Sequence, residues 1–493
     1  MMQPIRTYNL PPFSELRIIT NDHFNSIPLK PSITLIKKND NESAEIFGKE
    51  LVPGVEVALN EGERIAIYTW SGCTLQIKGS ILQEYESYDI NIMKEYLNII
   101  NLLNIKRQLS TINNTFGPRI LVTGSPSSGK SSFCTILCNY ALRFSWKPLF
   151  IDADPRSSCD KSSLKLYPGT VGCVLYDNMD IATNPLLYYY GYSYYQDNEF
   201  LYLHVIIRSS QLDCLLMKLL NVNIELMLYN NDNVIKSSGI VINAPYECNK
   251  DMIVKLCKIY KVSVIVVIDS PSIHQELIKH YKNEKNNIDI NIAKLAYNNI
   301  IINDNETKSD NPEPVKRSDA SENSANNSDE MLILSSSKLE GVISVDNNRL
   351  KYINNMNWNK YFEINNLGRN HIIKVNSSTI TFIYIDIIEP LTKDALPTNE
   401  EYVMKHKEMY CNAYTDDLLL LNNLIVAVPA TDDIKLIPYT NILSFFHIRS
   451  IESTASEDNT FTISLCCQTY YSPSSLPKYL LLPRDFKTLK YNP

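Results

Sequence analysis

One short stretch of the chain constrains its fold more than any other: GSPSSGKS, from Gly124 to Ser131. It follows the apolar run 120–122 and precedes a helix-like segment over 132–143, which is the context of the phosphate-binding loop G-x-x-x-x-G-K-[S/T]. Glycines let backbone N–H groups wrap a phosphate, and the N-terminus of the following helix adds a favourable dipole. The sequence therefore predicts a site for a nucleoside triphosphate.

Two side chains of this loop are expected to meet the phosphates and their metal ion. Lys130 would neutralise the β- and γ-phosphates, and Ser131 would ligate Mg²⁺. The other loop residues that we expect to bind the nucleotide are Gly124, Ser127, Ser128, Gly129 and Ser132. The alternative is a Gly/Ser-rich loop that matches the motif by chance. The strand-like run before it and the helix-like segment after it argue against that alternative.

A second apolar segment, 148–154, contains two carboxylates at its end, Asp152 and Asp154. In phosphate-loop proteins a strand beside the first one ends in an Asp that holds Mg²⁺ directly or through water. Both residues are candidates for that role, and the alternative is that they only cap the end of a strand. With a phosphate loop upstream, we favour the metal role, and Asp154 in particular.

Bulk properties bound the class of protein. The chain has 493 residues, which is too many for one hydrophobic core, and its formal charge of −7 gives no overall attraction to nucleic acid. Eleven cysteines include no C-x-x-C pair, so zinc-ligand spacing is absent. The N-terminus has no signal pattern, and no apolar run approaches the length of a membrane span. We therefore expect a soluble, reduced, intracellular protein.

The pattern of apolar residues divides the chain into three parts. Short alternating runs followed by a helix at 89–109 predict an N-terminal β domain with a linking helix, residues 1–108. Alternating strands and helices then predict a phosphate-loop domain at 109–362, with a parallel sheet covered by helices on both faces. Within it, 303–330 is polar and acidic and is expected to be a disordered insertion. Further strand-like runs predict a small, mainly β domain at 363–493.

Several blocks resemble one family, the polynucleotide 5'-hydroxyl-kinase-like proteins that include the ATP-binding subunit of the pre-mRNA cleavage and polyadenylation factor. The blocks are ELR, AEIFGKEL, EGERIAIYTWSGC, GSPSSGKSSFC, NYALR, YPGTVG, GIVIN and SLPKYLLLPRDFKTLK, and they run from end to end of the chain. The resemblance implies ATP and Mg as cofactors and an N-terminal domain that contacts the adenine through Glu15 and Arg64. On sequence alone, both would be taken for solvated charges at strand ends.

The same resemblance shows where the chain departs from active members of the family. Asp154 stands at the position of the catalytic base, but the family's Asp-x-Gly-Gln reads Asp154-Pro155-Arg156-Ser157. The Thr-x-Gly-Trp clasp for the RNA base reads Ala244-Pro245-Tyr246-Glu247. In the lid, expected near 347–361, Arg349 survives, but the residues before Tyr361 read Asn357-Trp358-Asn359-Lys360. A missing catalytic arginine costs about 10³–10⁵ in related phosphoryl transfers.

These departures favour an ATP-binding, non-catalytic subunit of the mRNA 3'-end cleavage machinery, with Mg·ATP as a structural ligand. The resemblance also implies a nuclear location and, as partners, the scaffold subunit of the cleavage factor and other 3'-end processing subunits. The first alternative is an active RNA 5'-hydroxyl kinase in which Lys130 and Asp154 are catalytic and Arg349 or Lys351 replaces the lost arginines. The second is an unrelated nucleotide-dependent switch without an RNA substrate.

Overall fold

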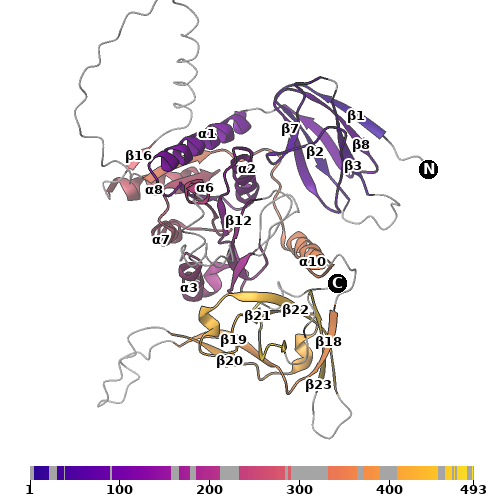
Figure 1. The fold of residues 1–493 in the computed structure, drawn as a ribbon, viewed down its shortest axis with the longest axis vertical. Coiled ribbons are helices and arrows are strands. Elements are labelled where there is room, and N and C mark those ends of the chain that lie inside the picture. Colours follow the sequence, from indigo (N-terminus) through magenta and orange to yellow (C-terminus); the bar gives the residue numbers. More distant parts are fainter. Residues whose placement is uncertain are drawn as a thin grey trace, which may run out of the picture.

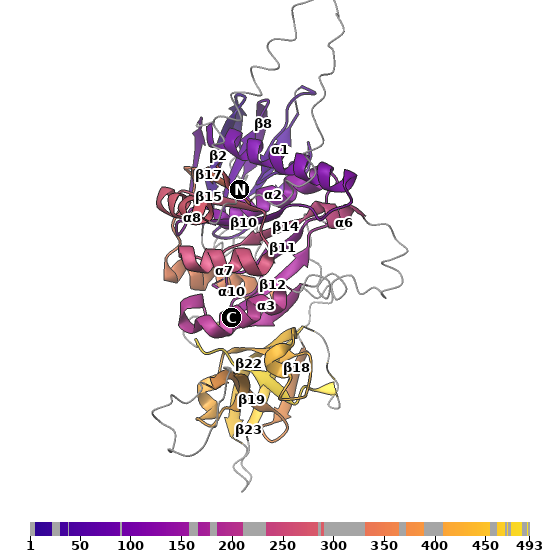
Figure 2. The same cartoon turned by 90° about the vertical axis from the view of Figure 1, so that its left-hand side faces the viewer.

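The computed structural model describes residues 5–21, 30–37, 39–88, 91–156, 166–177, 185–210, 233–283, 287–289, 331–363, 371–388, 408–453, 461–468, 471, 475–485 and 491. They form a β sandwich, a central α/β unit and a second β unit, with the central unit between the other two (Figures 1 and 2). The expected insertion at 303–330 lies outside the described residues. None of the helices described is both long and apolar enough to pass through a bilayer.

Two antiparallel sheets form the N-terminal sandwich. One has the order β1 (Ile5–Leu10), β8 (Cys73–Lys78), β3 (Ser32–Ile36), β6 (Glu56–Ala58). The other has the order β5 (Lys49–Glu50), β4 (Glu45–Ile46), β7 (Arg64–Thr69), β2 (Ser14–Ile19), β9 (Gln83–Ser87). Alternate residues of these strands, such as Leu16, Ile33 and Leu75, are fully buried between the sheets. The expected N-terminal β domain is confirmed.

A helix, α1 (Asn91–Ile112), follows the sandwich and packs on the central unit (Figure 1). Its apolar positions Tyr96, Ile100 and Leu103 are buried, as their helical spacing predicts. Arg107 on the same helix is also buried, and its Nε donates to the carbonyl oxygen of Ser238 at 2.9 Å. This hydrogen bond therefore fixes the C-terminal end of α6 (Asn233–Ser238) against α1.

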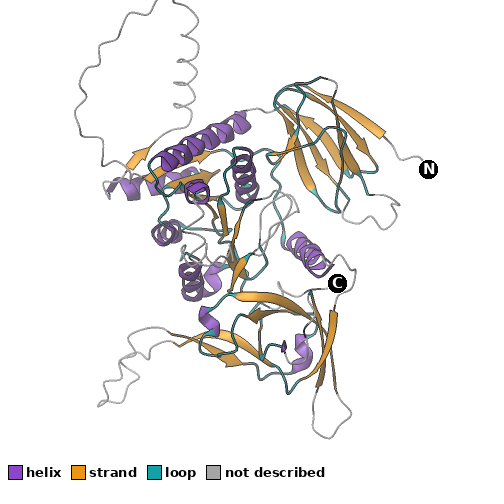
Figure 3. Ribbon diagram, in the orientation of Figure 1, coloured by secondary structure: helices purple, strands orange, loops and turns teal. Residues whose placement is uncertain are grey.

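The central sheet has the order β16 (Asn287–Asp289), β17 (Met331–Ser336), β15 (Val264–Ile268), β10 (Arg119–Gly124), β14 (Ile240–Asn243), β11 (Leu149–Asp152), all parallel. The middle strands β10, β14 and β15 are mostly apolar, as is typical of a parallel sheet that helices cover. Figure 3 shows the helices around the sheet. The helices packed around it include α2 (Lys130–Arg143), α3 (Glu199–Ser209), α7 (Lys250–Tyr260) and α8 (Pro271–Asn283). The parallel sheet with covering helices is the fold that the alternating pattern predicts.

One feature of the sheet was not predicted: it continues into the C-terminal unit. After β11 come two antiparallel strands, β12 (Thr170–Leu175) and β13 (Leu186–Tyr189). The latter pairs with β22 (Ile442–Ser453) at Leu187 and Ile442. The C-terminal strands are β18 (His371–Asn376), β19 (Thr381–Ile388), β20 (Glu408–Ala413), β21 (Ile425–Pro429), β23 (Phe461–Cys467) and β24 (Tyr479–Leu481). The C-terminal unit is therefore mainly β, as expected, but it shares a sheet with its neighbour.

The helix α10 (Asn347–Glu363) bridges the units. Trp358 is buried, with its ring stacked on Tyr167 at a centroid distance of 5.4 Å and set edge-on to Phe445 at 4.9 Å. The hydroxyl of Tyr361 accepts a hydrogen bond from the backbone N–H of Phe445 at 3.1 Å. The C-terminal half of α10 is therefore part of the packing between the central sheet and β22.

Candidate nucleotide-binding site

The loop between β10 and α2 has the backbone that its glycines predict. Gly124 has φ +146°, and a Cβ there would lie 2.0 Å from the carbonyl oxygen of Ile268, so no other residue fits. Ser127 and Gly129 also have positive φ, 53° and 86°. Left-handed residues of this kind turn successive N–H groups toward one concavity, which is the geometry that binds phosphate.

Lys130, the first residue of α2, holds this loop together. Its Nζ donates to the carbonyl oxygens of Ser125 at 3.0 Å, of Gly124 at 3.3 Å and of Tyr246 at 3.2 Å. The side chain is buried, with 6% of its surface exposed, in a cleft that it shares with Ser127 and Ser131. The ammonium group is therefore fixed at the mouth of the anion-binding loop, where a phosphate would meet it.

The hydroxyl of Ser131 is linked to the carboxylate of Asp152 through a side chain that the sequence did not single out. Asn243, the last residue of β14, donates from Nδ2 to Asp152 Oδ1 at 2.9 Å and lies 3.4 Å from Ser131 Oγ. Asp152 is fully buried and also accepts from the backbone N–H of Leu166 at 3.2 Å. A polar residue at the carboxyl end of a parallel strand was the available signal for Asn243.

Asp154 lies in the wall of the same cleft, just beyond the end of β11. It is buried, and its Oδ1 accepts from the backbone N–H of Arg156 at 3.2 Å. Its own N–H donates to Asp152 Oδ1, also at 3.2 Å. The two carboxylates are therefore neighbours, one tied to Ser131 through Asn243 and the other facing the cleft. Carboxylate oxygens are the ligands that Mg²⁺ prefers in proteins.

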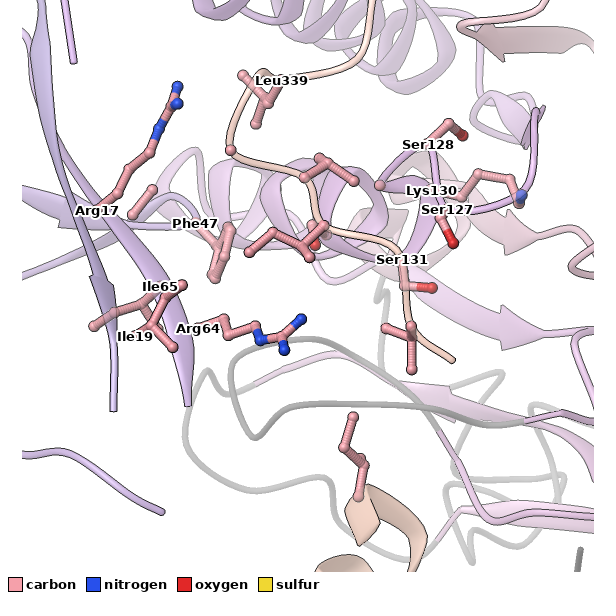
Figure 4. Close-up of a pocket in the computed structure, with 18 of the residues that line it drawn as sticks. Arg17, Ile19, Phe47, Arg64, Ile65, Ser127, Ser128, Lys130, Ser131 and Leu339 are labelled. Atoms are coloured by element: carbon pink, nitrogen blue, oxygen red, sulfur yellow. The ribbon is translucent and has the colours of Figure 1, made fainter. Parts of the chain in front are cut away.

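The sandwich supplies the opposite wall, through Glu15, Arg17 and Arg64. Figure 4 shows the two arginines on the sandwich side of the cleft. Glu15 is buried, not solvated, and its Oε1 accepts from Arg17 Nε at 2.5 Å. Burial lowers the pKa of Arg17, but Glu15 and Tyr85 raise it by more, so the net shift of the Arg17 pKa is upward and its guanidinium stays charged. Arg64 extends from the start of β7 toward the phosphate loop (Figure 4).

A segment between β17 and α10 closes the cleft between these walls, and no sequence pattern predicted it. Leu339, Val342 and Ile343 line the cleft, and Leu339 lies between the sandwich and the loop in Figure 4. A Cβ on Gly129 would lie 2.9 Å from Val342 Cγ2, and one on Gly341 would lie 2.9 Å from Arg17 Nε. This segment therefore touches both the phosphate loop and the sandwich.

The cleft has an empty volume of about 1260 Å³, including its open mouth. All the residues expected to bind the nucleotide line it except Gly124, which begins the loop: Glu15, Arg64, Ser127, Ser128, Gly129, Lys130, Ser131 and Ser132. Within the described residues, no group of three or more His, Cys, Asp or Glu side chains is arranged to hold a metal ion alone. The donor set suits Mg²⁺, which takes few protein ligands and completes its shell with phosphate oxygens and water.

The residues that depart from the family's catalytic pattern have other contacts. Tyr246 lies beside the loop, its hydroxyl 3.4 Å from Ser127 Oγ, and the Arg156 guanidinium carbon lies 3.9 Å from the centre of its ring. Arg349, on the first turn of α10, donates from Nη2 to the carbonyl oxygen of Gly62 in the sandwich. Arg349 is not among the residues that line the cleft.

Two family models match the chain. One, described as the P-loop of the mRNA cleavage and polyadenylation factor CLP1, matches residues 124–309. The other, the N-terminal beta-sandwich domain of polyadenylation factor, matches residues 9–110. Together they cover more than half of the chain, and they meet at the cleft described above. The chain belongs to the Clp1 family.

Relatives carry the same family name. A protein CLP1 homolog from Nematostella vectensis is 30% identical over 243 residues, which is 48% of this chain and 53% of that protein. The polyribonucleotide 5'-hydroxyl-kinase Clp1 of Gallus gallus is 29% identical over 240 residues, again 48% and 53%. The matched part of the chain thus spans about half the length of these curated relatives.

The fold extends further than the sequence similarity. A solved structure of a wild-type Clp1p–Pcf11p complex matches with a TM-score of 0.66 at 16% identity, covering 100% of this chain and 99% of that one. A second, which describes the extended interface between Pcf11p and Clp1p and the basis for ATP loss in a point mutant, also has a TM-score of 0.66. The three-part architecture is therefore that of Clp1.

Proposed function

We propose that this protein is an ATP-binding, non-catalytic subunit of the mRNA 3'-end cleavage and polyadenylation machinery, in which Mg·ATP is a structural ligand. The observation that carries the proposal is the cleft, which the phosphate loop and the sandwich line from opposite sides. A ligand bound there contacts both domains and the segment between β17 and α10. Because it binds only the folded form, it stabilises their arrangement by mass action.

The residues at the phosphate end support binding more strongly than turnover. Lys130, Ser131 and the carboxylates of Asp152 and Asp154 would hold Mg·ATP. Phosphoryl transfer also needs cations over the transferring group. The lid arginine, Arg349, instead bonds a sandwich carbonyl, and Trp358 is buried in packing against the C-terminal sheet. Bound ATP would then turn over slowly or not at all.

We also propose a nuclear location and a scaffold partner of the kind that Pcf11p provides for Clp1p. Solved Clp1p structures with a close fold were determined with Pcf11p, which supports a partner-binding role for this architecture. Other 3'-end processing subunits would be the remaining neighbours. Co-purification of tagged protein from the source cells tests this proposal. Recovery with subunits unrelated to mRNA 3'-end formation would contradict it.

Nucleotide content of the purified protein tests the ligand. We expect adenine nucleotide to be released on denaturation, and added Mg·ATP to raise the melting temperature. At a ligand concentration 100 times Kd, the stabilisation is about 2.7 kcal/mol. The matched variant is Lys130→Ala, which should lose both effects. If the wild type shows neither nucleotide release nor a higher melting temperature, the structural-ligand proposal is wrong. Preferential binding of guanine nucleotides would instead favour a switch protein.

The second candidate is an active polynucleotide 5'-hydroxyl kinase that phosphorylates RNA 5' ends. The buried Asp154 in the cleft wall favours it, since this residue could orient a 5'-hydroxyl. Incubation with labelled ATP and a 5'-hydroxyl RNA oligonucleotide separates the two candidates. Label transfer that disappears in Lys130→Ala would replace the non-catalytic proposal with this one.

A further inference from the structure

Arg156 is a buried cation at the phosphate end of the cleft that the family pattern does not account for. Only 4% of its surface is exposed, yet it lines the cleft that contains Lys130 and Asp154. Arginine is almost never fully buried unless an anion or an equivalent set of acceptors satisfies it, because removing the charge from water is unfavourable.

The described residues satisfy this guanidinium only in part. Its Nε has no hydrogen-bond partner among them, and its Nη2 lies 3.5 Å from the carbonyl oxygen of Val345. The nearby Asp154 carboxylate accepts from the backbone N–H of Arg156, not from its side chain. Contacts with the rings of Tyr246 and Tyr194, at 3.9 and 5.7 Å, hold the guanidinium in place but supply no acceptor in its plane.

Tyr246 connects Arg156 to the phosphate loop. Its hydroxyl lies 3.4 Å from Ser127 Oγ, and its carbonyl oxygen accepts from Lys130 Nζ. The ammonium group of Lys130 is also 5.8 Å from the centre of the Tyr246 ring, which Arg156 approaches at 3.9 Å. Two cations therefore lie around one ring beside the loop. The paired Glu15 and Arg17 line the same cleft from the sandwich.

We propose that Arg156 binds the terminal phosphate of the bound nucleoside triphosphate and so makes the site selective for ATP over ADP. The inference rests on the proposed ATP-binding function and deepens it. A nucleotide with its phosphates on the loop directs the last phosphate toward the Lys130 end of the cleft. There the guanidinium fork of Arg156 matches two phosphoryl oxygens, and the ring of Tyr246 fixes its plane. In this arrangement Arg156 is a binding residue, and no phosphoryl transfer is required of it.

Calorimetric titration of the full-length protein with Mg·ATP and with Mg·ADP tests the proposal. The wild type should bind ATP about 10- to 100-fold more tightly than ADP, the range expected for one or two charge-assisted hydrogen bonds. Arg156→Gln should lower ATP affinity by about that factor and change ADP affinity by less than about threefold. Arg156→Lys keeps the charge without the fork and should fall between the two. Arg64→Gln, at the sandwich wall, is the matched control and should weaken ATP and ADP equally.

Equal affinity of the wild type for ATP and ADP would overturn the proposal, whether or not any variant folds. The proposal would also be wrong if Arg156→Gln and Arg156→Lys lost ATP and ADP affinity equally. That result would leave the proposed function intact. Failure of the wild type to bind either nucleotide would instead refute the proposed function itself. A parallel titration with a 5'-hydroxyl RNA oligonucleotide completes the test. If the Arg156 variants lose affinity for RNA but keep the preference for ATP, the anion that Arg156 binds is an RNA phosphate and the proposal is wrong.

Discussion

The contact between the sandwich and helix α2 depends on one buried carboxylate, Glu45. It is 3% exposed, and it accepts a hydrogen bond from the Tyr140 hydroxyl at 2.7 Å and one from Arg143 Nη1 at 2.7 Å. The same tyrosine oxygen accepts from Trp70 Nε1 at 3.0 Å. Since α2 begins with the phosphate loop, these bonds couple the sandwich to the nucleotide site. We expect Glu45→Ala to loosen that coupling.

The expected cost follows from what each partner loses. The buried hydroxyl of Tyr140 loses Glu45, its one acceptor among the described residues, which costs about 1–3 kcal/mol. Arg143 is about a quarter exposed and also pairs with Glu50, so its loss is closer to that of a surface ion pair, about 0.5–1 kcal/mol. Glu45→Ala should therefore reduce the free energy of unfolding by about 1.5–4 kcal/mol.

Glu50→Ala is the matched control, because Glu50 also pairs with Arg143 but is 58% exposed. Urea denaturation followed by circular dichroism and tryptophan fluorescence should show less than about 1 kcal/mol for this variant. If Glu45→Ala and Glu50→Ala differ by less than about 0.5 kcal/mol, the buried carboxylate does not couple the two domains, and the reasoning fails.

The same carboxylate has a pH signature. Burial raises the pKa of Glu45 above 4.5, although Tyr140 and Arg143 partly offset this. Folding therefore favours the protonated form, and the contribution of Glu45 to stability declines as pH rises from about 4.5 through the raised folded value. In Glu45→Gln this decline should disappear, so the stability difference between wild type and variant should change with pH in that window only.

Two further predictions concern other parts of the chain. Gly124→Ala should abolish stabilisation by Mg·ATP in thermal unfolding, since its Cβ would lie 2.0 Å from the Ile268 carbonyl oxygen; unchanged stabilisation would show that the loop tolerates a shift there. Burial, with a smaller effect from Arg449, lowers the pKa of His447 from 6.5 to about 4, so this histidine is neutral in the fold. Stability should fall by about 3 kcal/mol as pH drops from about 6.5 to 4, and His447→Phe should remove that loss in acid-unfolding titrations.

Much of the fold could be predicted because patterns of apolar residues within short segments determine its strands and helices. The runs that form β10, β14 and β15 are continuous and apolar, and the alternation with helices implies a parallel sheet. The continuation through β13 into β22 could not be predicted, because one pair, Leu187 with Ile442, joins strands far apart in the chain. The domain boundaries at 108 and 362 stay predictions, since no comparison tests them.

The candidate site also has one part that could be predicted from the sequence and one part that could not. The phosphate loop could be predicted because a single contiguous motif encodes its backbone. The other wall could not be predicted from residue patterns alone: Glu15 is buried only because Arg17 and the sandwich fold around it, and without the family resemblance it looked like a solvated charge. Asn243 was missed for a related reason, since its link to Asp152 depends on β14 lying next to β11.

The stretch Asp154-Pro155-Arg156-Ser157 lacks the Gly and Gln of the family's catalytic motif. The structure indicates a binding role for one of the replacements, Arg156. If the catalytic motif had only been lost, we would expect a small or exposed residue at this position, because burying an arginine has a large desolvation cost. Arg156 is instead buried against Tyr246, itself a replacement for the clasp residue, and both line the cleft. The two replacements contact each other, so they form one unit. Under the proposed function, this unit binds the terminal phosphate through one fixed cation, Arg156, and phosphoryl transfer is not required of it.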